Sequence, residues 1–305
     1  MARPKVFVLR SDRLGDIVLS SGYLASLVES YPDHEVELWL SSEMVVCGQI
    51  LHPGLTVRAL PFDRYLQCGI EPAKKWIESV NASEYALAVI PQFTLGYPEV
   101  LALSWLDIKP RWGFLNRELG VRPEWVDRDL GPPRNAPGEW IDVGVEIDPY
   151  LHEVEKYRLL SEAQGLAVSS VAPRLFGLTE PTANAGLLIW PGSGDEYRRW
   201  PAERFATVAK SIGSDRITIG VTAGDLNAAE ELSTHLKATG VYTGISFRDP
   251  GDLRGTAQWL SGFQFLLTND TGIAHLAAAA GVRVAAVSGS QHQGRFTVFG
   301  PKALT

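Results

Sequence analysis

The chain has 305 residues, of which 45% are hydrophobic and 21% are charged, and its formal net charge is −7. This length and apolar content suit two domains with large buried cores. The negative charge gives no electrostatic reason to expect a nucleic-acid partner. No apolar run approaches the roughly 20 residues of a membrane-spanning helix, and the first residues lack a secretory hydrophobic segment. We therefore expect a cytoplasmic protein.

The cysteines and histidines give no sign of a metal or disulfide framework. Cys47 and Cys68 are too few for a disulfide scaffold. The six histidines are dispersed along the chain without zinc-like spacing. We therefore expect neither a metal nor a cofactor.

The chain begins with an apolar run, a polar loop and an amphipathic stretch. Residues 6–10 (VFVLR) predict a strand, and residues 17–31 predict a helix with one apolar side. Asp16 ends the intervening loop SDRLGD, at the expected helix start. This carboxylate is a candidate for chemistry, and a helix cap is the alternative.

The rest of the first half alternates strands and helices. Strands are predicted at residues 36–40, 57–60, 86–90 and 111–114, and helices at residues 72–80 and 97–106. This order is typical of a mostly parallel sheet covered on both faces. Residues 122–149 are rich in Pro, Gly and charge, so we expect an excursion near a cleft. Trp125 and Trp140 there either contact a substrate or pack beneath the loop.

A second α/β unit follows a helix and an extended connection. The helix is predicted at residues 150–165, and Pro173 and Pro181 stiffen the connection. Strands are predicted at residues 187–190, 216–221, 241–244, 265–268 and 284–287, and helices at 201–212, 227–238, 252–262 and 271–280. We therefore predict a domain of residues 1–166, a linker of residues 167–185 and a domain of residues 186–305.

The segment GLLIWPGSGDEYRRWP, residues 186–201, joins a strand to a helix through a Gly-rich turn. Ser193 and Gly194 can donate hydroxyl and backbone hydrogen bonds to a phosphate, and Arg198 or Arg199 can add charge-assisted ones. The alternative is a turn that only changes the chain direction.

The segment FLLTNDTGIAHLAAAAGV, residues 265–282, repeats this arrangement. Its helix is expected to begin near Thr271, so unpaired N–H groups and the positive end of the helix dipole form an anion site. Asp270 can cap the helix, Gly272 permits close approach of a ligand, and His275 lies one turn further on. The alternative is an ordinary capped helix. In TAGDLNAAEE, Asp225 and Asn227 either help to hold a nucleoside or provide a helix cap.

Together these segments resemble glycosyltransferase family nine, the ADP-heptose:lipopolysaccharide heptosyltransferases. The resemblance is carried by RSDRLGDIVLSSGYLASLVESYPDHEVELWL, YLHEVEKYRLLSEAQGL, WPGSGDEYRRWPAERF and TNDTGIAHLAAAAGV. It implies a GT-B architecture, in which two Rossmann-like doubly wound domains face a central cleft. A nucleotide-sugar is then expected in the C-terminal half and an acceptor in the N-terminal half.

The resemblance also assigns roles to residues. Asp16 corresponds to the proposed general base, Ser193, Gly194 and Arg198 to donor-phosphate contacts, and Asp270, Thr271, Gly272 and His275 to the donor-binding turn. The implied reaction is metal-independent transfer of a sugar, heptose by the family default, from ADP-heptose to a glycan hydroxyl with inversion. A lipopolysaccharide-core acceptor and peripheral contact with the inner face of the membrane follow as expectations.

Two other functions remain open. A GT-B-like sugar-nucleotide epimerase would use the same cleft without an acceptor, and a non-catalytic nucleotide-sugar-binding protein would keep the donor turn alone. Ser288-Gly289-Ser290 replaces the more usual Gly-Pro-Thr of the family, which leaves the acceptor, the closure mechanism and the sugar open. Asp16 in the matching N-terminal motif favours transfer.

Overall fold

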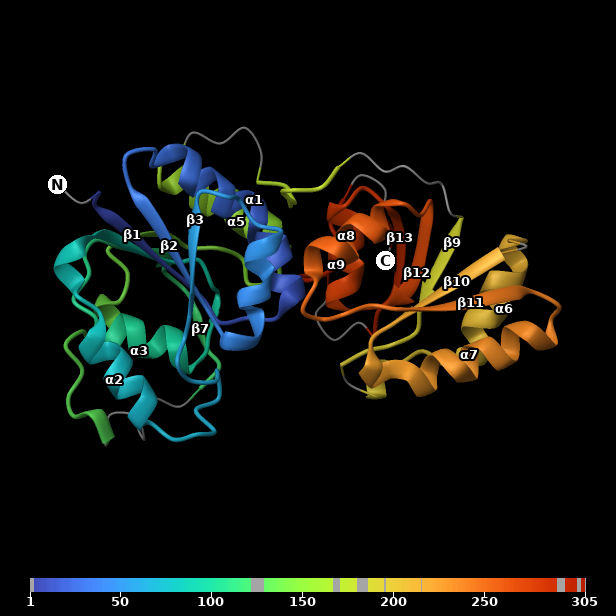
Figure 1. The fold of residues 1–305 in the computed structure, drawn as a ribbon. Coiled ribbons are helices and arrows are strands. Elements are labelled where there is room, and N and C mark those ends of the chain that lie inside the picture. Colours follow the sequence, from blue (N-terminus) through green and yellow to red (C-terminus); the bar gives the residue numbers. More distant parts are fainter. Residues whose placement is uncertain are drawn as a thin grey trace. The chain divides into compact units, whose positions relative to one another are not determined.

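The computed structural model describes residues 3–121, 129–166, 171–179, 186–194, 196–214, 216–289, 294–300 and 303–304. The chain forms two compact units (Figure 1). The first unit comprises Met1–Arg13 and Ser20–Val171, and the second comprises Leu14–Leu19 and Ala172–Thr305. Each unit contains a six-stranded sheet.

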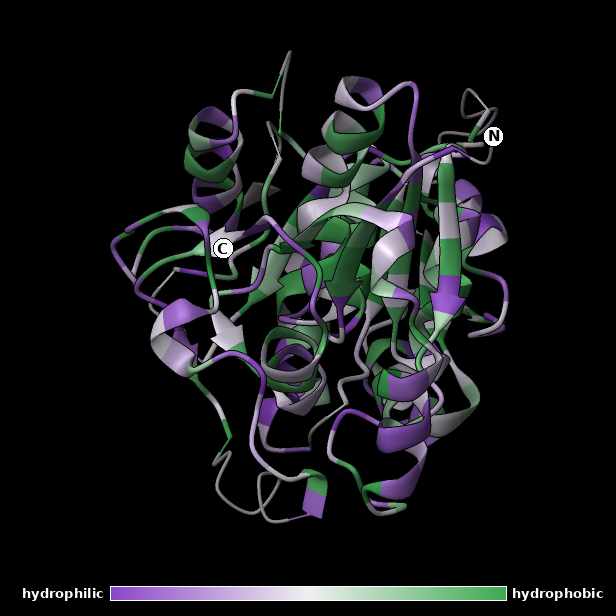
Figure 2. Ribbon diagram, turned by 90° about the vertical axis from the view of Figure 1, so that its left-hand side faces the viewer, coloured by the Kyte–Doolittle hydropathy of each residue, from purple (hydrophilic) through white to green (hydrophobic). Residues whose placement is uncertain are grey.

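The sheet of the first unit is entirely parallel, with the strand order β3-β2-β1-β4-β6-β8. Its strands are β1 (Lys5–Arg10), β2 (Glu35–Leu40), β3 (Leu55–Ala59), β4 (Tyr85–Ile90), β6 (Arg111–Phe114) and β8 (Val143–Val145). Near-continuous apolar runs such as VFVL in β1 form these strands because a parallel sheet is buried on both faces. The strands are accordingly the most hydrophobic part of the ribbon (Figure 2).

Helices and shorter elements complete the first unit. They are α1 (Leu14–Ser30), α2 (Glu71–Ser79), α3 (Tyr97–Trp105), α5 (Glu153–Ala163), the 3₁₀ turns η1 (Ser42–Gln49), η2 (Ala82–Glu84) and η3 (Pro137–Glu139), and the strand pair β5 (Thr94–Leu95) with β7 (Glu118–Leu119). The core joins Phe7 of β1 to Trp76 of α2 and Leu103 of α3. The first six residues of α1 belong to the second unit.

The second unit repeats the plan with the strand order β11-β10-β9-β12-β13-β14, again all parallel. Its strands are β9 (Leu187–Trp190), β10 (Arg216–Val221), β11 (Tyr242–Phe247), β12 (Phe265–Asn269), β13 (Arg283–Val287) and β14 (Ala303–Leu304). Its helices and turns are η4 (Glu196–Arg198), α6 (Ala202–Ile212), η5 (Ala223–Asp225), α7 (Leu226–Ala238), α8 (Leu253–Ser261) and α9 (Gly272–Ala279).

The predicted α/β class and the predicted strands are confirmed, but the interpretation of residues 122–149 needs correction. The end of that segment forms β8, an edge strand of the sheet. Trp140 is buried in the core, and its Nε1 donates to the carbonyl oxygen of Asn135 at 3.2 Å, so it packs rather than facing a ligand. Trp125 lies outside the described residues. Residues 167–170 and 180–185 of the expected linker do so too, and the domain boundaries stay a prediction.

The strand orders predict where ligands bind. In each sheet the chain proceeds from one central strand towards one edge and later resumes on the other side of that strand. The two switch points are the pairs β1/β4 and β9/β12. Open α/β sheets bind ligands in the crevice at the carboxyl ends of such a pair. Among the described residues, no helix is both long and apolar enough to cross a membrane.

Candidate functional site

A hollow of about 300 Å³ lies at the carboxyl edge of the second sheet. It is lined by residues 197–200, which precede α6, by Asp270 after β12, and by residues 287–289 at the end of β13. Two residues predicted to bind a donor, Arg198 and Asp270, therefore line one hollow although 72 positions separate them in the sequence. The fold brings them together because β9 and β12 are neighbours.

The loop after β9 contains a buried hydroxyl, that of Ser193. Ser193 is 4% exposed, and its Oγ has no hydrogen-bond partner among the described residues. Gly194 is exposed, and a Cβ there would meet no atom within 4 Å. The buried serine therefore retains hydrogen-bonding capacity, while Gly194 leaves the backbone open to approach.

The two arginines of this loop have different tasks. The Nη2 of Arg199 lies 3.1 Å from Oδ1 of Asp225 and donates to the carbonyl oxygen of Ser193 at 3.2 Å. Arg199 thus holds the loop against the start of α7. The guanidinium of Arg198 lies 5.9 Å from the ring centre of Tyr197 and lines the hollow. Of the two arginines proposed from the sequence, Arg198 is the better candidate for a ligand contact.

Asp225 supports the same loop. It occupies the N-cap position of α7, but its side chain makes no capping hydrogen bond. Its carboxylate pairs instead with Arg199 and accepts a hydrogen bond from Thr222 Oγ1 at 3.2 Å. A Cβ at Gly192 would collide with this carboxylate, so a larger residue there would displace the ion pair. Of the two roles considered for Asp225 from the sequence, the helix cap is not observed, and the carboxylate forms an ion pair instead.

The turn after β12 also differs from the expected cap. Helix α9 begins at Gly272, and Thr271, with extended backbone, holds the N-cap position. The Thr271 side chain makes no capping hydrogen bond, and its Oγ1 has no partner among the described residues. Asp270 is therefore not the N-cap. Its Oδ2 accepts from Ser288 Oγ at 3.4 Å, and its backbone N–H donates to the carbonyl oxygen of Val287 at 3.0 Å.

The remaining predicted residues belong to the second unit as well. His275 is 6% exposed on α9, and a Cβ at Gly15 would lie 2.8 Å from its ring carbon Cδ2. Asp16 follows Gly15 and is the third residue of α1, whose N-cap position is held by Arg13. A carboxylate in a first helical turn interacts favourably with the helix dipole. Asp16 is half-buried there.

Sequence reasoning missed a buried charge cluster in the first unit. Arg10, the last residue of β1, is 2% exposed, with Nη2 lying 2.6 Å from Asp12 Oδ2 and Nη1 donating to Tyr157 OH at 2.6 Å. The carboxylate of Glu99 accepts from the N–H groups of Ser11 and Gly96 at 3.1 and 3.0 Å. Burial, and then the nearby charge of Asp12, raise the pKa of Glu99. The arginine ending VFVLR was the available signal.

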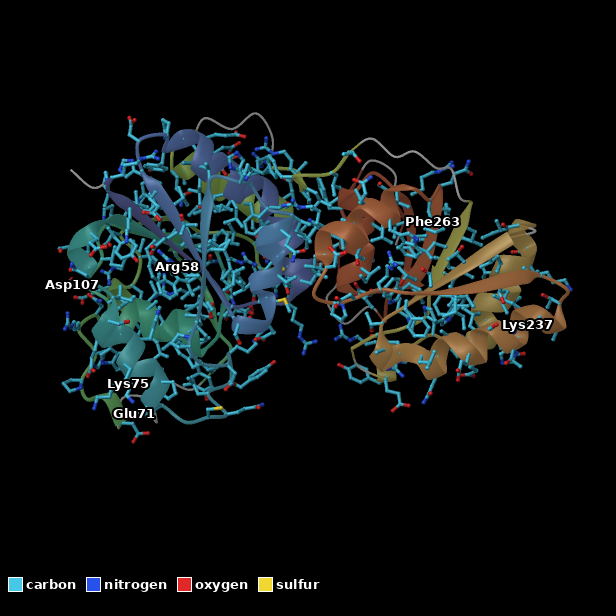
Figure 3. The ribbon with its side chains drawn as sticks, viewed as in Figure 1. Arg58, Glu71, Lys75, Asp107, Lys237 and Phe263 are labelled. Atoms are coloured by element: carbon cyan, nitrogen blue, oxygen red, sulfur yellow. The ribbon has the colours of Figure 1, made fainter. Side chains whose placement is uncertain are left out.

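The first unit also contains a more open hollow, of about 630 Å³. It lies between α2 and the loop that precedes it, and Glu71 and Lys75 of α2 line it (Figure 3). Trp76 forms part of its wall and also belongs to the core. None of the residues proposed from the sequence lies there.

The family comparison covers more than half of the chain. A model of glycosyltransferase family 9 (heptosyltransferase) matches residues 143–304, which include the second sheet and both turns around the hollow. No curated protein matches the chain. The similarity to known proteins is otherwise one of structure.

Three solved structures share the fold. A family 9 glycosyl transferase from Veillonella parvula superposes with a TM-score of 0.71 at 17% identity, covering 100% of this chain and 87% of that chain. E. coli heptosyltransferase WaaC with ADP-2-deoxy-2-fluoro heptose gives 0.71 at 18% identity, covering 98% and 92%. E. coli ADP-heptose lps heptosyltransferase II gives 0.66 at 17%, covering 98% and 89%.

At identities this low, the superpositions show only a shared fold, the GT-B fold with Rossmann-like units. The family match supplies the class of activity. The resemblance of the two ligand turns to the family is thereby confirmed at the level of the family, while the roles of single residues remain proposals. The chain belongs to glycosyltransferase family 9, the heptosyltransferase family, and is a glycosyltransferase.

Proposed function

We propose that this chain transfers a heptose from ADP-heptose to a hydroxyl of a lipopolysaccharide-core glycan, with inversion and without a metal. The family description supports a heptose donor. One structural relative was solved with an ADP-heptose analogue. The acceptor, and a contact of the protein with the inner face of the membrane, rest on the family alone.

The observation that carries the proposal is the pair of unpartnered hydroxyls at Ser193 and Thr271. They follow β9 and β12, the strands of the second switch point. A polar group shielded from water costs free energy unless it is hydrogen-bonded. A diphosphate supplies acceptor oxygens for both hydroxyls and for the first N–H groups of α9. Arg198 adds a charge-assisted hydrogen bond.

These groups suit the leaving diphosphate of a glycosyl transfer. Negative charge builds on the diphosphate as the bond to the sugar breaks. Fixed donors aimed at that charge lower the barrier because they need no reorganisation during the reaction. Arg198, the two hydroxyls and the helix dipole of α9 provide such donors from this chain's own residues.

Asp16 is proposed as the general base that takes the proton of the attacking hydroxyl. The close approach of Gly15 to His275 supports this role, since both lie in the second unit with the donor turns. Asp270 suits the base poorly, because a carboxylate beside a diphosphate is repelled unless it is hydrogen-bonded. We assign Asp270 to sugar or ribose hydroxyls. A single displacement by the acceptor inverts the anomeric carbon.

The test is mass spectrometry of the purified chain with ADP-heptose, with and without a truncated lipopolysaccharide-core acceptor. We expect release of ADP and a heptose mass added to the acceptor, with no divalent metal added. GDP- and UDP-sugars serve as donor controls. An isomerised nucleotide-sugar formed without acceptor, separated from the substrate by chromatography because epimers have the same mass, would instead identify an epimerase. Binding of ADP-heptose without turnover on any acceptor would identify a binding protein.

A further inference from the structure

The amide of Asn269, a buried residue beside the hollow, joins both ends of the loop that carries Ser193 and Arg198. Asn269 is the last residue of β12 and is 0% exposed. Its Oδ1 accepts the backbone N–H of Trp200 at 2.8 Å. Its Nδ2 donates to the carbonyl oxygen of Pro191 at 2.7 Å and to that of Gly192 at 3.4 Å.

These contacts close the loop on itself. Pro191 follows β9, and Trp200 lies two residues before α6. The side chain of Asn269 is therefore hydrogen-bonded to both ends of the loop that joins this strand to this helix. The bonds need an acceptor and two donors on the same short group. Asparagine provides both. Aspartate lacks the donors, and serine or threonine has a single hydroxyl.

The contacts also couple the two donor turns. Asn269 directly precedes Asp270 and Thr271, so its backbone belongs to one turn while its side chain holds the other. The Arg199–Asp225 ion pair fixes the same loop from the opposite direction, against α7. A site held in its binding geometry before the ligand arrives loses less entropy on binding.

We propose that Asn269 is a positioning residue that holds the loop between β9 and α6. In this position of the loop, Ser193 and Arg198 bind the same diphosphate as Thr271. This inference rests on the proposed donor site. Asn269 acts through the loop and does not contact the ligand. Its loss should therefore weaken the binding of diphosphate more than the binding of the nucleoside alone.

The test is calorimetry on the full chain with ADP and adenosine as probes, using Asn269→Leu and the milder Asn269→Thr. Neither variant introduces a charge that would itself repel a phosphate. We expect the Kd for ADP to rise roughly tenfold or more, the scale of one lost buried hydrogen bond. The Kd for adenosine should change far less.

A matched control is Thr268→Val, one residue earlier on the same strand. Thr268 is also 0% exposed, and its Oγ1 donates to the carbonyl oxygen of Trp190 at 2.9 Å. This variant loses a buried hydrogen bond within the sheet but leaves the loop closed. It should lower the melting temperature while keeping the wild-type Kd for ADP.

The outcomes separate the two proposals. A wild-type chain that binds no nucleoside diphosphate refutes the donor site itself. Wild-type binding of ADP by both Asn269 variants refutes only the role of Asn269. An equal loss of affinity in Thr268→Val, or failure of both Asn269 variants to fold, would show that the residue supports the fold rather than the site.

Discussion

The two sheets share one topology but present different chemistry at their switch points. After β1, the guanidinium of Arg10 is buried and paired with Asp12. After β9 and β12, Arg198 lines a hollow, and the hydroxyls of Ser193 and Thr271 in the same two turns have no partner among the described residues. The first edge pairs its arginine with a carboxylate, whereas the second combines an arginine at a hollow with the positive end of the α9 dipole.

This contrast indicates which substrate each edge suits. Ser11 Oγ in the first unit also has no partner among the described residues, but its N–H donates to the Glu99 carboxylate. Nearby carboxylates disfavour an anion and tolerate a neutral hydroxyl. We therefore expect the diphosphate at the second edge and a glycan hydroxyl at the first. Variants on the two sides can test this division.

The largest effect is expected from Asp16→Asn, which keeps the side-chain size and removes the basic carboxylate. Turnover with both substrates saturating should fall by roughly 10²–10⁴-fold, the range typical of general acid–base catalysis. The Kd for ADP and the circular dichroism spectrum should stay unchanged. Near-normal turnover in the folded variant would contradict the assignment of the base.

The next effect concerns Arg198→Ala. A hydrogen bond to a charged group is worth about 1.5–3 kcal/mol, so the Kd for ADP should rise roughly 10- to 100-fold. Arg204→Ala removes the same charge from an exposed position on α6 and is the control. Calorimetry at fixed salt separates the two variants. Equal affinities would place the diphosphate elsewhere.

Smaller losses are expected from Ser193→Ala and Thr271→Val. Each removes a hydroxyl that has no partner among the described residues, so the melting temperature should hardly change. The Kd for ADP should still rise, by roughly five- to tenfold for each hydrogen bond lost to the phosphates. Ser11→Ala removes a comparable hydroxyl from the first edge. A similar loss of ADP affinity in Ser11→Ala would contradict the expectation that only the second edge binds the diphosphate.

Much of the fold follows from the sequence because parallel strands read as buried apolar runs between amphipathic helices. Apolar runs predicted β9 and β12, and the helical spacing after residue 271 predicted α9. The edge strands β8 and β14 were missed, because short edge strands need few apolar residues and take their register from a neighbour. Local sequence also could not show that Thr271, not Asp270, holds the N-cap position of α9.

Two of the residues that line the hollow, Arg198 and Asp270, were candidates from the sequence, but the contacts that hold their turns were not predictable. Both turns are visible as Gly-rich segments after apolar strands. The ion pair of Arg199 depends on Asp225, which lies 26 positions from Arg199 and is brought near by the pairing of β9 with β10. The contacts of Asn269 with Pro191 and Trp200 depend likewise on the pairing of β9 with β12. Pairing of distant strands, rather than local pattern, decides such roles.

The smallest effect is expected from the buried carboxylate of Glu37 in the first unit. Glu37 is 2% exposed, its Oε1 lies 3.1 Å from Arg58 Nη2, and its Oε2 accepts from Tyr85 OH. Burial alone raises the pKa of Glu37, but the hydrogen bonds from Tyr85 and Arg58 outweigh it and leave the pKa below its ordinary value. The carboxylate is therefore bound more favourably than the protonated acid in the folded chain.

Because the folded-state pKa is the lower one, Glu37 stabilises the fold above its unfolded pKa of about 4.3. That contribution disappears as the pH falls through the folded-state pKa. The melting temperature of the wild-type chain should thus exceed that of Glu37→Gln at pH 7. The difference should shrink as the pH falls from about 5 to about 3, through the unfolded-state pKa of roughly 4.3 and then through the lower folded-state pKa. Glu78→Gln, at an exposed position on α2, is the control. A difference in melting temperature that stays constant or grows in acid would show that the shape of Glu37, and not its charge, stabilises the fold. The ion pair with Arg58 would then contribute little to the stability of the first unit.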